Sequence, residues 1–375
     1  MLMQRTGLSA DRARVALVAL CALGLFGLAS EAGAQATNLK FQASFPPSSL
    51  IFESSKLFAQ RVEQLSGGRL KIDMLPAGTV VGAFEVLDAT SKGVIDGAHS
   101  AAAYWTGKNK AATLFGPAPG GPFGMDMLDY IGWLYEGGGI ELYREFYQDV
   151  LKSNVVVIPL TPVPNQVLGW FKRPVKNWAD LKGRKCRETG ITAEVFVQSG
   201  MSVVNIPGGE IVPAGERGVI DCGEWVGPAE DMRIGFQNIW KHYYMPSTHE
   251  PATVLELLIN GDVWKKLPKD LQEIMQSAAM EVNLRTQVLI NRANADALRE
   301  LTEKHGVKIE RTPNDILIKI LESWDKIAKA EYEKNAFFRK VYDSQKAYAG
   351  KVVSARRFVY SPYDLMADYY WPVKK

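Results

Sequence analysis

Beyond the first 35 residues, the hydrophobic pattern alternates between strand and helix periods. Residues 39–43 form a short apolar strand candidate, and residues 50–65 repeat apolar side chains at helical spacing. Ser66-Gly67-Gly68 then ends the helix, because glycine suits the position after a helix C-terminus. Residues 70–74 alternate between apolar and polar side chains, as a strand with one buried face does. This order predicts a β-α-β unit.

A five-residue pattern occurs twice in the chain. Residues 92–96 (KGVID) recur as residues 217–221 (RGVID), each time after an acidic, helix-like segment. In both copies the glycine ends a helix and the apolar residues start a strand, a common junction that coincidence also explains. Because the flanking residues match as well, we predict two similar α/β lobes.

Longer apolar stretches predict the framework around these units. Residues 154–160 (NVVVIPL) form a continuous apolar strand that we expect to be buried on both faces, and residues 253–259 (TVLELLI) form another. After Pro268 no helix breaker occurs before Gly306, so a helix of roughly 40 residues is expected. A helix of that length braces two lobes or pairs with a second chain.

The N-terminus has the pattern of an export signal. Three arginines precede an apolar run, residues 15–29, and the small residues Ala32-Gly33-Ala34 follow it. This order predicts a cleaved signal peptide, residues 1–34, and a periplasmic protein. The run is shorter than the ~20 residues of a membrane span. The alternative is that the segment is not cleaved and that its apolar run anchors the protein in the membrane.

Charge and cysteine content narrow the function further. The net charge is +3 over 375 residues, and no basic stripe with interleaved aromatic residues occurs, so a nucleic-acid partner is not expected. Beyond the signal segment the chain contains Cys186 and Cys222. An oxidising compartment permits a disulfide, but the sequence does not show whether the two lie close together. We expect them to be unpaired.

No catalytic template fits the sequence. It contains no Gly-x-Ser-x-Gly elbow, Walker loop or Gly-x-Gly-x-x-Gly motif, and none of its four histidines has zinc-ligand spacing. Polar residues do stand at predicted strand ends, where open α/β sheets bind ligands. These residues are Gln166, Arg187, Glu224-Trp225 and Glu250.

Each of these residues also has a purely structural explanation. Taken alone, Arg187 is better explained as a surface ion pair with Glu188 or Glu194. The two glutamates, 224 and 250, fit solvated loops, Gln166 fits a turn, and Trp225 fits the core. From the residues alone, the prediction stops at a secreted two-lobed α/β protein.

A resemblance extends this prediction. Several motifs spread over nearly all of the mature chain resemble the substrate-binding proteins of tripartite ATP-independent periplasmic (TRAP) transporters. They are Leu181-Lys182-Gly183 followed by Arg187, residues 207–213 (PGGEIVP), residues 216–221 (ERGVID), residues 224–228 (EWVGP), His249-Glu250-Pro251 and Pro122-Phe123-Gly124. The resemblance implies a two-lobed, periplasmic-binding-protein-like α/β fold with a long bracing helix. It places lobe I at residues 35–160 and about 252–290, and lobe II at 161–251 and about 291–375.

The stretch is most similar to the branch of this family that binds 2-oxo acids and lactate with a metal ion. This similarity implies that Arg187 grips the ligand carboxylate with both arms of its guanidinium. It also implies that Gln166, Glu224, Glu250 and the carbonyl of Trp225 hold a hard cation, Ca²⁺ or Na⁺, with Ca²⁺ slightly favoured on charge. Tyr104, Phe123 and Trp225 are expected as walls of the substrate site, with Phe45 a weaker candidate.

The resemblance thus implies a solute-binding protein, not an enzyme. Its ligand would be a small monocarboxylate, a 2-oxo or 2-hydroxy acid, and its partner a TRAP-type membrane permease. A homodimer through the long helix is a further expectation. The rival interpretations are a secreted metal-dependent enzyme acting on a carboxylate and a sensory receptor that presents its ligand to a membrane kinase.

Overall fold

The computed structural model describes residues 36–372 except Pro117. The predicted signal peptide, residues 1–34, lies outside the described residues. From Asn38 onward, the described chain forms one compact unit. None of its helices is both long and apolar enough to cross a membrane.

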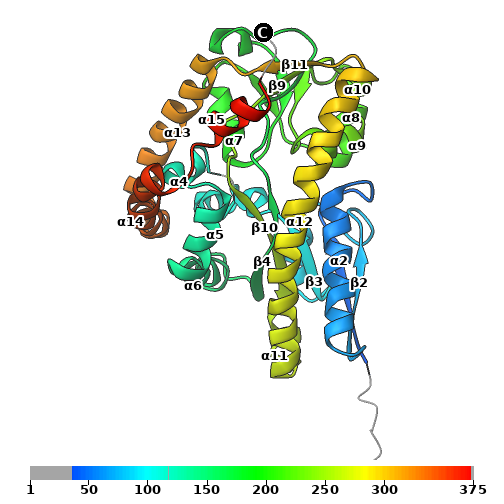
Figure 1. Cartoon of the computed structure of the whole chain (residues 1–375). Helices are drawn as coiled ribbons and strands as arrows, with labels where there is room; N and C mark the ends of the chain where they lie inside the picture. Colours follow the sequence, from blue (N-terminus) through cyan, green and yellow to red (C-terminus); the bar gives the residue numbers. More distant parts are fainter. Residues whose placement is uncertain (1–35, 117, 373–375) are drawn as a thin grey trace, which may run out of the picture. The chain divides into compact units, whose positions relative to one another are not determined.

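One sheet contains five strands in the order β2-β1-β3-β10-β4 (Figure 1). They are β1 (Thr37–Ala43), β2 (Leu70–Leu75), β3 (Gly97–Ser100), β4 (Val155–Val163) and β10 (Thr253–Asn260). The predicted β-α-β unit is confirmed as β1, α2 (Leu50–Leu65) and β2. Ser49 caps the first turn of α2, and Gly67 and Gly68 end it at positive φ, as the sequence indicated.

The second sheet contains six strands in the order β11-β9-β5-β8-β6-β7. They are β5 (Gly169–Phe171), β6 (Lys185–Arg187), β7 (Ser202–Val204), β8 (Cys222–Gly223), β9 (His242–Met245) and β11 (Lys308–Arg311). The repeated pattern divides between the sheets. Gly93 separates α3 (Val86–Ser91) from β3, and Gly218 separates α8 (Gly208–Glu216) from β8, both with positive φ. The helix end at the glycine is therefore confirmed in both copies. The strand start is corrected, because β3 begins at Gly97 and β8 at Cys222, after the apolar residues of the pattern.

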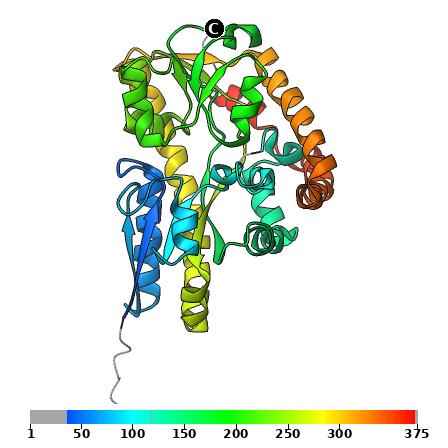
Figure 2. The same cartoon turned by 180° about the vertical axis from the view of Figure 1, so that it is seen from behind.

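The long helix, α12 (Lys269–Glu303), runs beside both sheets and starts after Pro268 as predicted (Figures 1 and 2). It packs on α2 and β4 in the first lobe and on α9 (Pro228–Ile234) in the second. It also explains the burial of β4. This strand lies at a sheet edge, but α12 covers it, so its apolar run is almost wholly buried.

The remaining helices surround these sheets. They are α4 (Gly121–Gly124), α5 (Met127–Glu136), α6 (Gly139–Glu145), α7 (Gly190–Val197), α10 (Phe236–Ile239), α11 (Gly261–Lys266), α13 (Asn314–Lys334), α14 (Ala336–Val359), α15 (Tyr363–Tyr370), the short helical turns η1 (Ala102–Trp105), η2 (Lys110–Leu114) and η4 (Trp178–Leu181), and the π-helix η3 (Phe146–Val150).

The lobe boundaries stay a prediction, with one correction. The sheets draw on the stretches that the sequence assigned to each lobe, but α14 does not follow the second lobe. It packs on α4, α5 and η2 in the first lobe. Its buried side chains Phe338 and Val341 join the core around Trp133, an interaction between distant residues that the sequence does not reveal.

Candidate functional site

A small cavity of about 40 Å³ lies where residues of the two lobes meet. Its lining includes six of the seven residues predicted to contact ligand or cation, namely Tyr104, Gln166, Arg187, Glu224, Trp225 and Glu250. The Arg187 and Glu224 side chains are only 2–3% exposed. The two lobes are therefore closed over this cavity.

Strand ends bring the polar residues together. Arg187 ends β6 and Glu224 follows β8, and these strands are parallel neighbours with Arg187 opposite Gly223. On the other side, Gln166 follows β4 and Glu250 precedes β10. The Gln166 N–H donates to the Glu250 carbonyl over 3.1 Å, which joins the two segments. The predicted site residues thus gather at the ends of strands, where open α/β sheets bind ligands.

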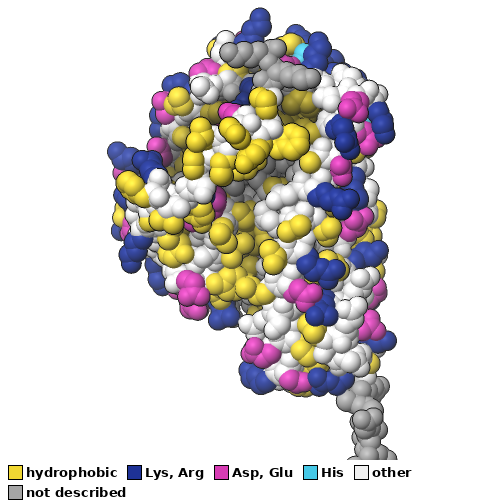
Figure 3. All heavy atoms as spheres, in the orientation of Figure 1, with side chains coloured by type: hydrophobic (Ala, Val, Ile, Leu, Met, Phe, Trp, Pro, Cys, Tyr) yellow, Lys and Arg dark blue, Asp and Glu magenta, His cyan; other side chains and the backbone are white. Residues whose placement is uncertain are grey.

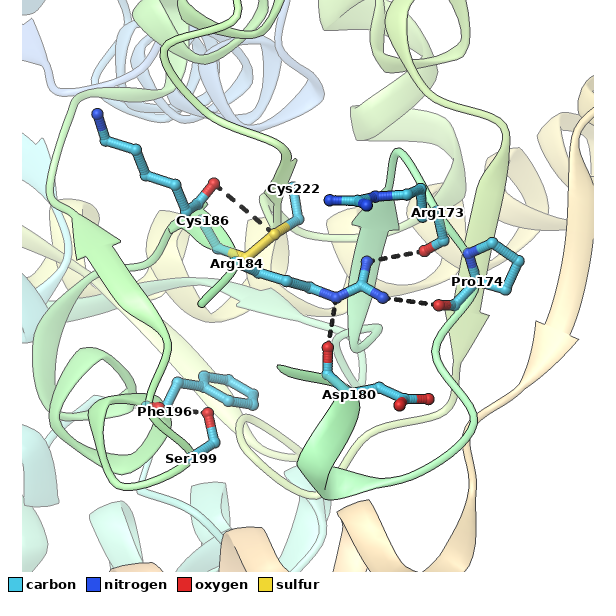
Figure 4. Close-up of a disulfide and its surroundings, with 9 residues drawn as sticks. Arg173, Pro174, Asp180, Arg184, Cys186, Phe196, Ser199 and Cys222 are labelled. Carbon is cyan, nitrogen blue, oxygen red and sulfur yellow. Dashed lines mark hydrogen bonds between the residues drawn. A yellow bond between two sulfur atoms is a disulfide. The ribbon is translucent and has the colours of Figure 1, made fainter. Parts of the chain in front are cut away.

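A disulfide joins Cys186 to Cys222 beside this site (Figure 4). The expectation that these cysteines are unpaired was wrong. The bond forms because β6 and β8 pair in a register that places Cys186 directly opposite Cys222. Separation along the sequence could not show that register. The disulfide connects the residue before Arg187 with the strand that leads to Glu224.

Arg187 is held by acceptors from the protein. Its Nη1 donates to the Glu224 carbonyl (2.8 Å) and to Glu224 Oε2 (3.2 Å), and its Nε donates to the Ile206 carbonyl (3.3 Å). The guanidinium also lies 5.4 Å from the ring centre of Trp225. Nη2 takes part in none of these three hydrogen bonds. The alternative of a surface ion pair therefore does not hold, since Arg187 is buried.

Three buried carboxyl groups surround this single arginine. Burial raises the pKa of Glu224 to about 8, although Arg187 opposes the rise and Asp231 adds to it. Burial also raises the pKa values of Glu188 and Glu250 well above their usual range, with repulsion from Glu224 as a further cause. Without another cation, full ionisation of the three groups would leave more negative charge than Arg187 balances, and the raised pKa values favour their protonated forms.

Several oxygens around the cavity have no hydrogen-bond partner among the described residues. These are Gln166 Oε1, Glu224 Oε1 and Thr253 Oγ1, and in addition Glu188 Oε2 close by. Glu250 Oε1 accepts only a long hydrogen bond from Thr192, 3.4 Å. Leaving such atoms unpaired is costly, and oxygen donors of this kind are the ligands that a hard cation takes. No cluster of three or more His, Cys, Asp or Glu side chains with metal-site geometry occurs within residues 36–372. The weakly bonded or unpaired donors among the predicted cation ligands come from two carboxylates, Glu224 and Glu250, and one amide, Gln166.

Aromatic rings form the apolar walls. The Phe45 ring meets Trp225 edge-on at 6.3 Å, and Tyr104 packs against Phe84. Burial raises the pKa of Tyr104 to about 12, so its hydroxyl keeps its proton. Gly208, from the PGGEI motif, lies against Trp225 so closely that any side chain there would collide with the indole. This close approach explains the glycine.

Phe123 is the exception among the predicted residues. It does not line the cavity but contacts Tyr342 of α14, with ring centres 4.6 Å apart. The turn that contains it has positive φ at Gly120, Gly121 and Phe123 itself. The prediction that Phe123 forms a wall is corrected accordingly.

Sequence reasoning also missed several residues at the site. Glu188, Thr192 and Thr253 contribute buried polar oxygens in or beside the cavity. The sequence carried one signal for Glu188, its position directly after Arg187, but there it was interpreted as a surface ion-pair partner. The threonines gave no signal, since threonine is common in strands and helix starts.

Two α/β lobes closed over a charged, oxygen-lined cavity define a solute-binding protein. The chain belongs to the DctP family, bacterial extracellular solute-binding protein family 7, whose model matches residues 41–336. This membership confirms the resemblance to TRAP solute-binding proteins. The family and its related proteins bind substrates for transporters and are not enzymes.

Known relatives support this placement. The monocarboxylate 2-oxoacid-binding periplasmic protein of Nostoc is 33% identical over 327 residues, 87% of this chain and 88% of that protein. A TRAP solute-binding protein from Bordetella bronchiseptica is 28% identical with a TM-score of 0.84, over 90% of this chain and 98% of that one. Its crystal structure is a dimer with calcium and picolinate in one active site. A TRAP periplasmic solute-binding protein from Pseudoalteromonas atlantica, solved with sodium and pyruvate, is 32% identical with a TM-score of 0.80. The match covers 87% of this chain and 97% of that one.

Proposed function

We propose that this protein captures a small monocarboxylate, a 2-oxo or 2-hydroxy acid, together with a cation and delivers it to a TRAP-type permease. The observation that carries the proposal is the set of buried oxygens without partners, Gln166 Oε1 and Glu224 Oε1, beside the buried guanidinium of Arg187. A cation supplies a partner for the oxygens, and the guanidinium supplies one for a carboxylate.

Each residue then has a definite task. Arg187 anchors the ligand carboxylate, while Gln166, Glu224, Glu250 and the Trp225 carbonyl hold the cation. The relatives support this division, because pyruvate and picolinate both carry a second donor atom next to the carboxylate. A ligand of that kind binds the cation through two atoms at once. The walls of Tyr104 and Trp225 then exclude water from the ion pair.

Charge balance favours Ca²⁺ over Na⁺. Glu224 and Glu250 contribute two negative charges, the ligand a third, and Arg187 one positive charge, so a divalent ion makes the enclosed set neutral. Burial raises the pKa of all three carboxyl groups, but a cation bound to Glu224 and Glu250 would favour their ionised forms, whereas Glu188, which is not among its ligands, stays protonated. With Na⁺ the same set keeps one negative charge.

The size of the cavity favours a small acid. Its 40 Å³ correspond to about three waters at 10–15 Å³ each, which occupy roughly 90 Å³ of liquid. A carboxylic acid with three or four carbon atoms fits such a volume. A longer or aromatic acid requires the walls to move apart.

Two further parts of the proposal concern location and partners. The predicted signal peptide and the family favour a periplasmic protein.

The homodimer through the long helix is supported by exposed apolar residues on α12, where Met280, Leu284 and Val288 recur at helical spacing. Light scattering on the wild type and on Leu284→Glu tests this dimer, which predicts a smaller mass for the variant.

A thermal-shift panel of small acids and sugars, each with Ca²⁺, Na⁺ or EDTA, tests the binding function. A ligand at 100 times its Kd stabilises the folded state by ~2.7 kcal/mol. Stabilisation by pyruvate or lactate that EDTA abolishes supports the divalent site. Stabilisation by sugars alone contradicts the proposal. A permease gene beside this one favours transport, whereas a sensor-kinase gene favours the receptor alternative.

A further inference from the structure

Helix α9 of the second lobe meets the start of helix α2 of the first lobe (Figures 1 and 2). Glu230 on α9 is 0% exposed, and its carboxylate accepts hydrogen bonds from two groups of the other lobe. Ser49 Oγ donates to Glu230 Oε2 over 2.8 Å, and the Ile51 N–H donates to Oε1 over 3.0 Å. A carboxylate from one lobe therefore caps a helix of the other.

The same carboxylate also holds the wall of the cavity. Trp225 Nε1 donates to Glu230 Oε2 over 3.1 Å, so the indole that lies beside Arg187 is tied to the contact between the lobes. One side chain thus joins the position of the cavity wall to the docking of α2.

The neighbouring acid shows that this arrangement is specific to Glu230. Asp231 accepts hydrogen bonds from Trp170 Nε1, Tyr243 Oη and the Val226 N–H, each 2.8–3.0 Å long and each from the second lobe. Asp231 therefore fastens α9 to its own lobe, whereas Glu230 reaches across to the first. A second contact between the lobes, Arg233 with Glu53, is a largely exposed ion pair and contributes little to closure.

We propose that Glu230 is the closure latch of this protein, a positioning residue that holds the Trp225 wall in its own lobe and stabilises the closed lobes through its contacts with the start of α2. The inference rests on the proposed function, because it assumes that the lobes open and close around a ligand. When the lobes separate, Ser49 and the Ile51 N–H leave the carboxylate, and water replaces them. The two hydrogen bonds from Ser49 and the Ile51 N–H therefore favour the closed state alone, whereas the bond from Trp225 lies within the second lobe. Because ligand affinity scales with the fraction of closed, binding-competent protein, the latch raises affinity without touching the ligand.

The test compares Glu230→Gln with the control Arg233→Ala at the same helix contact. Pyruvate affinity and dissociation rate are measured in calcium-containing buffer by calorimetry and stopped-flow tryptophan fluorescence. The glutamine variant replaces one acceptor oxygen by an amide donor, so about a tenfold rise in Kd is expected, mostly through faster dissociation. The control is expected to change Kd less than about twofold.

Two further measurements separate a latch from a general structural role. The thermal midpoint without ligand is expected to change little in Glu230→Gln, whereas the ligand-induced rise in midpoint shrinks. Ser49→Ala, which removes a donor from the other lobe, is expected to weaken pyruvate binding non-additively with Glu230→Gln.

Additive effects of the two variants, or wild-type affinity in Glu230→Gln, overturn the latch. A wild-type protein that binds no carboxylate instead overturns the proposed function. The two failures are therefore distinguishable.

Discussion

Replacing Arg187 by lysine tests the ligand anchor while keeping its charge. The guanidinium uses Nε and Nη1 for three hydrogen bonds to Ile206 and Glu224, which fixes its plane beside the cavity. Lysine keeps the positive charge that three buried carboxyl groups need, so the fold survives. It has no planar fork, however, and cannot hold a carboxylate through two parallel hydrogen bonds.

The expected loss follows from one missing hydrogen bond to a charged group, worth about 1.5–3 kcal/mol. Since 1.4 kcal/mol corresponds to tenfold in affinity, Arg187→Lys should weaken pyruvate binding roughly 10- to 150-fold. Calorimetry at saturating Ca²⁺ measures this directly, because the cation site is then filled in both proteins.

Arg184 provides the matched control. Figure 4 shows its guanidinium directed away from the disulfide toward three backbone carbonyls, those of Asp180 (2.6 Å), Arg173 (2.8 Å) and Pro174 (2.6 Å). Arg184→Lys loses the same kind of fork and should lower thermal stability while leaving Kd within about twofold. Equal affinity in wild type and Arg187→Lys, or equal losses in the two variants, would refute the assignment.

Three other outcomes follow from the site. Replacing both Cys186 and Cys222 by serine removes a disulfide between residues 36 positions apart. The loss should lower the free energy of unfolding by ~4 kcal/mol and with it the thermal midpoint, and an unchanged midpoint argues against the bond. Glu224→Gln should weaken pyruvate binding in the presence of Ca²⁺ at least about tenfold. If Ca²⁺ strengthens pyruvate binding as much in this variant as in the wild type, Glu224 is not a cation ligand. Because burial raises the pKa of Glu224 from about 4.5 to about 8, the folded protein holds a proton there that the unfolded chain releases. The stability of the ligand-free protein should therefore fall as pH rises through that window, by up to about 1.4 kcal/mol per unit, whereas calcium affinity should rise. A flat calcium titration between pH 6 and 8 contradicts this linkage.

Local patterns predicted the elements of this fold well. The β-α-β start, the two helices that end at a glycine and the long helix all depend on spacing within short stretches, and each is confirmed. Pro268 marks the start of α12 because proline is tolerated there and nowhere inside the helix.

Features that depend on distant residues were beyond the sequence. The pairing of Cys186 with Cys222 follows from the register of β6 and β8, and Phe123 packs against Tyr342, which is distant in the sequence. Glu188 became part of the site only because its neighbours bury it. The role of Glu230 likewise needs two helices from different lobes, which no spacing along the chain indicates.

The most direct test of the central claim is a crystal structure of the protein with pyruvate and Ca²⁺, with the cation located by anomalous scattering. We expect one peak about 2.3–2.6 Å from Gln166 Oε1, Glu224 Oε1 and a Glu250 oxygen, with the pyruvate carboxylate on Arg187. A pyruvate bound away from Arg187, or a cation outside these three side chains, would contradict it.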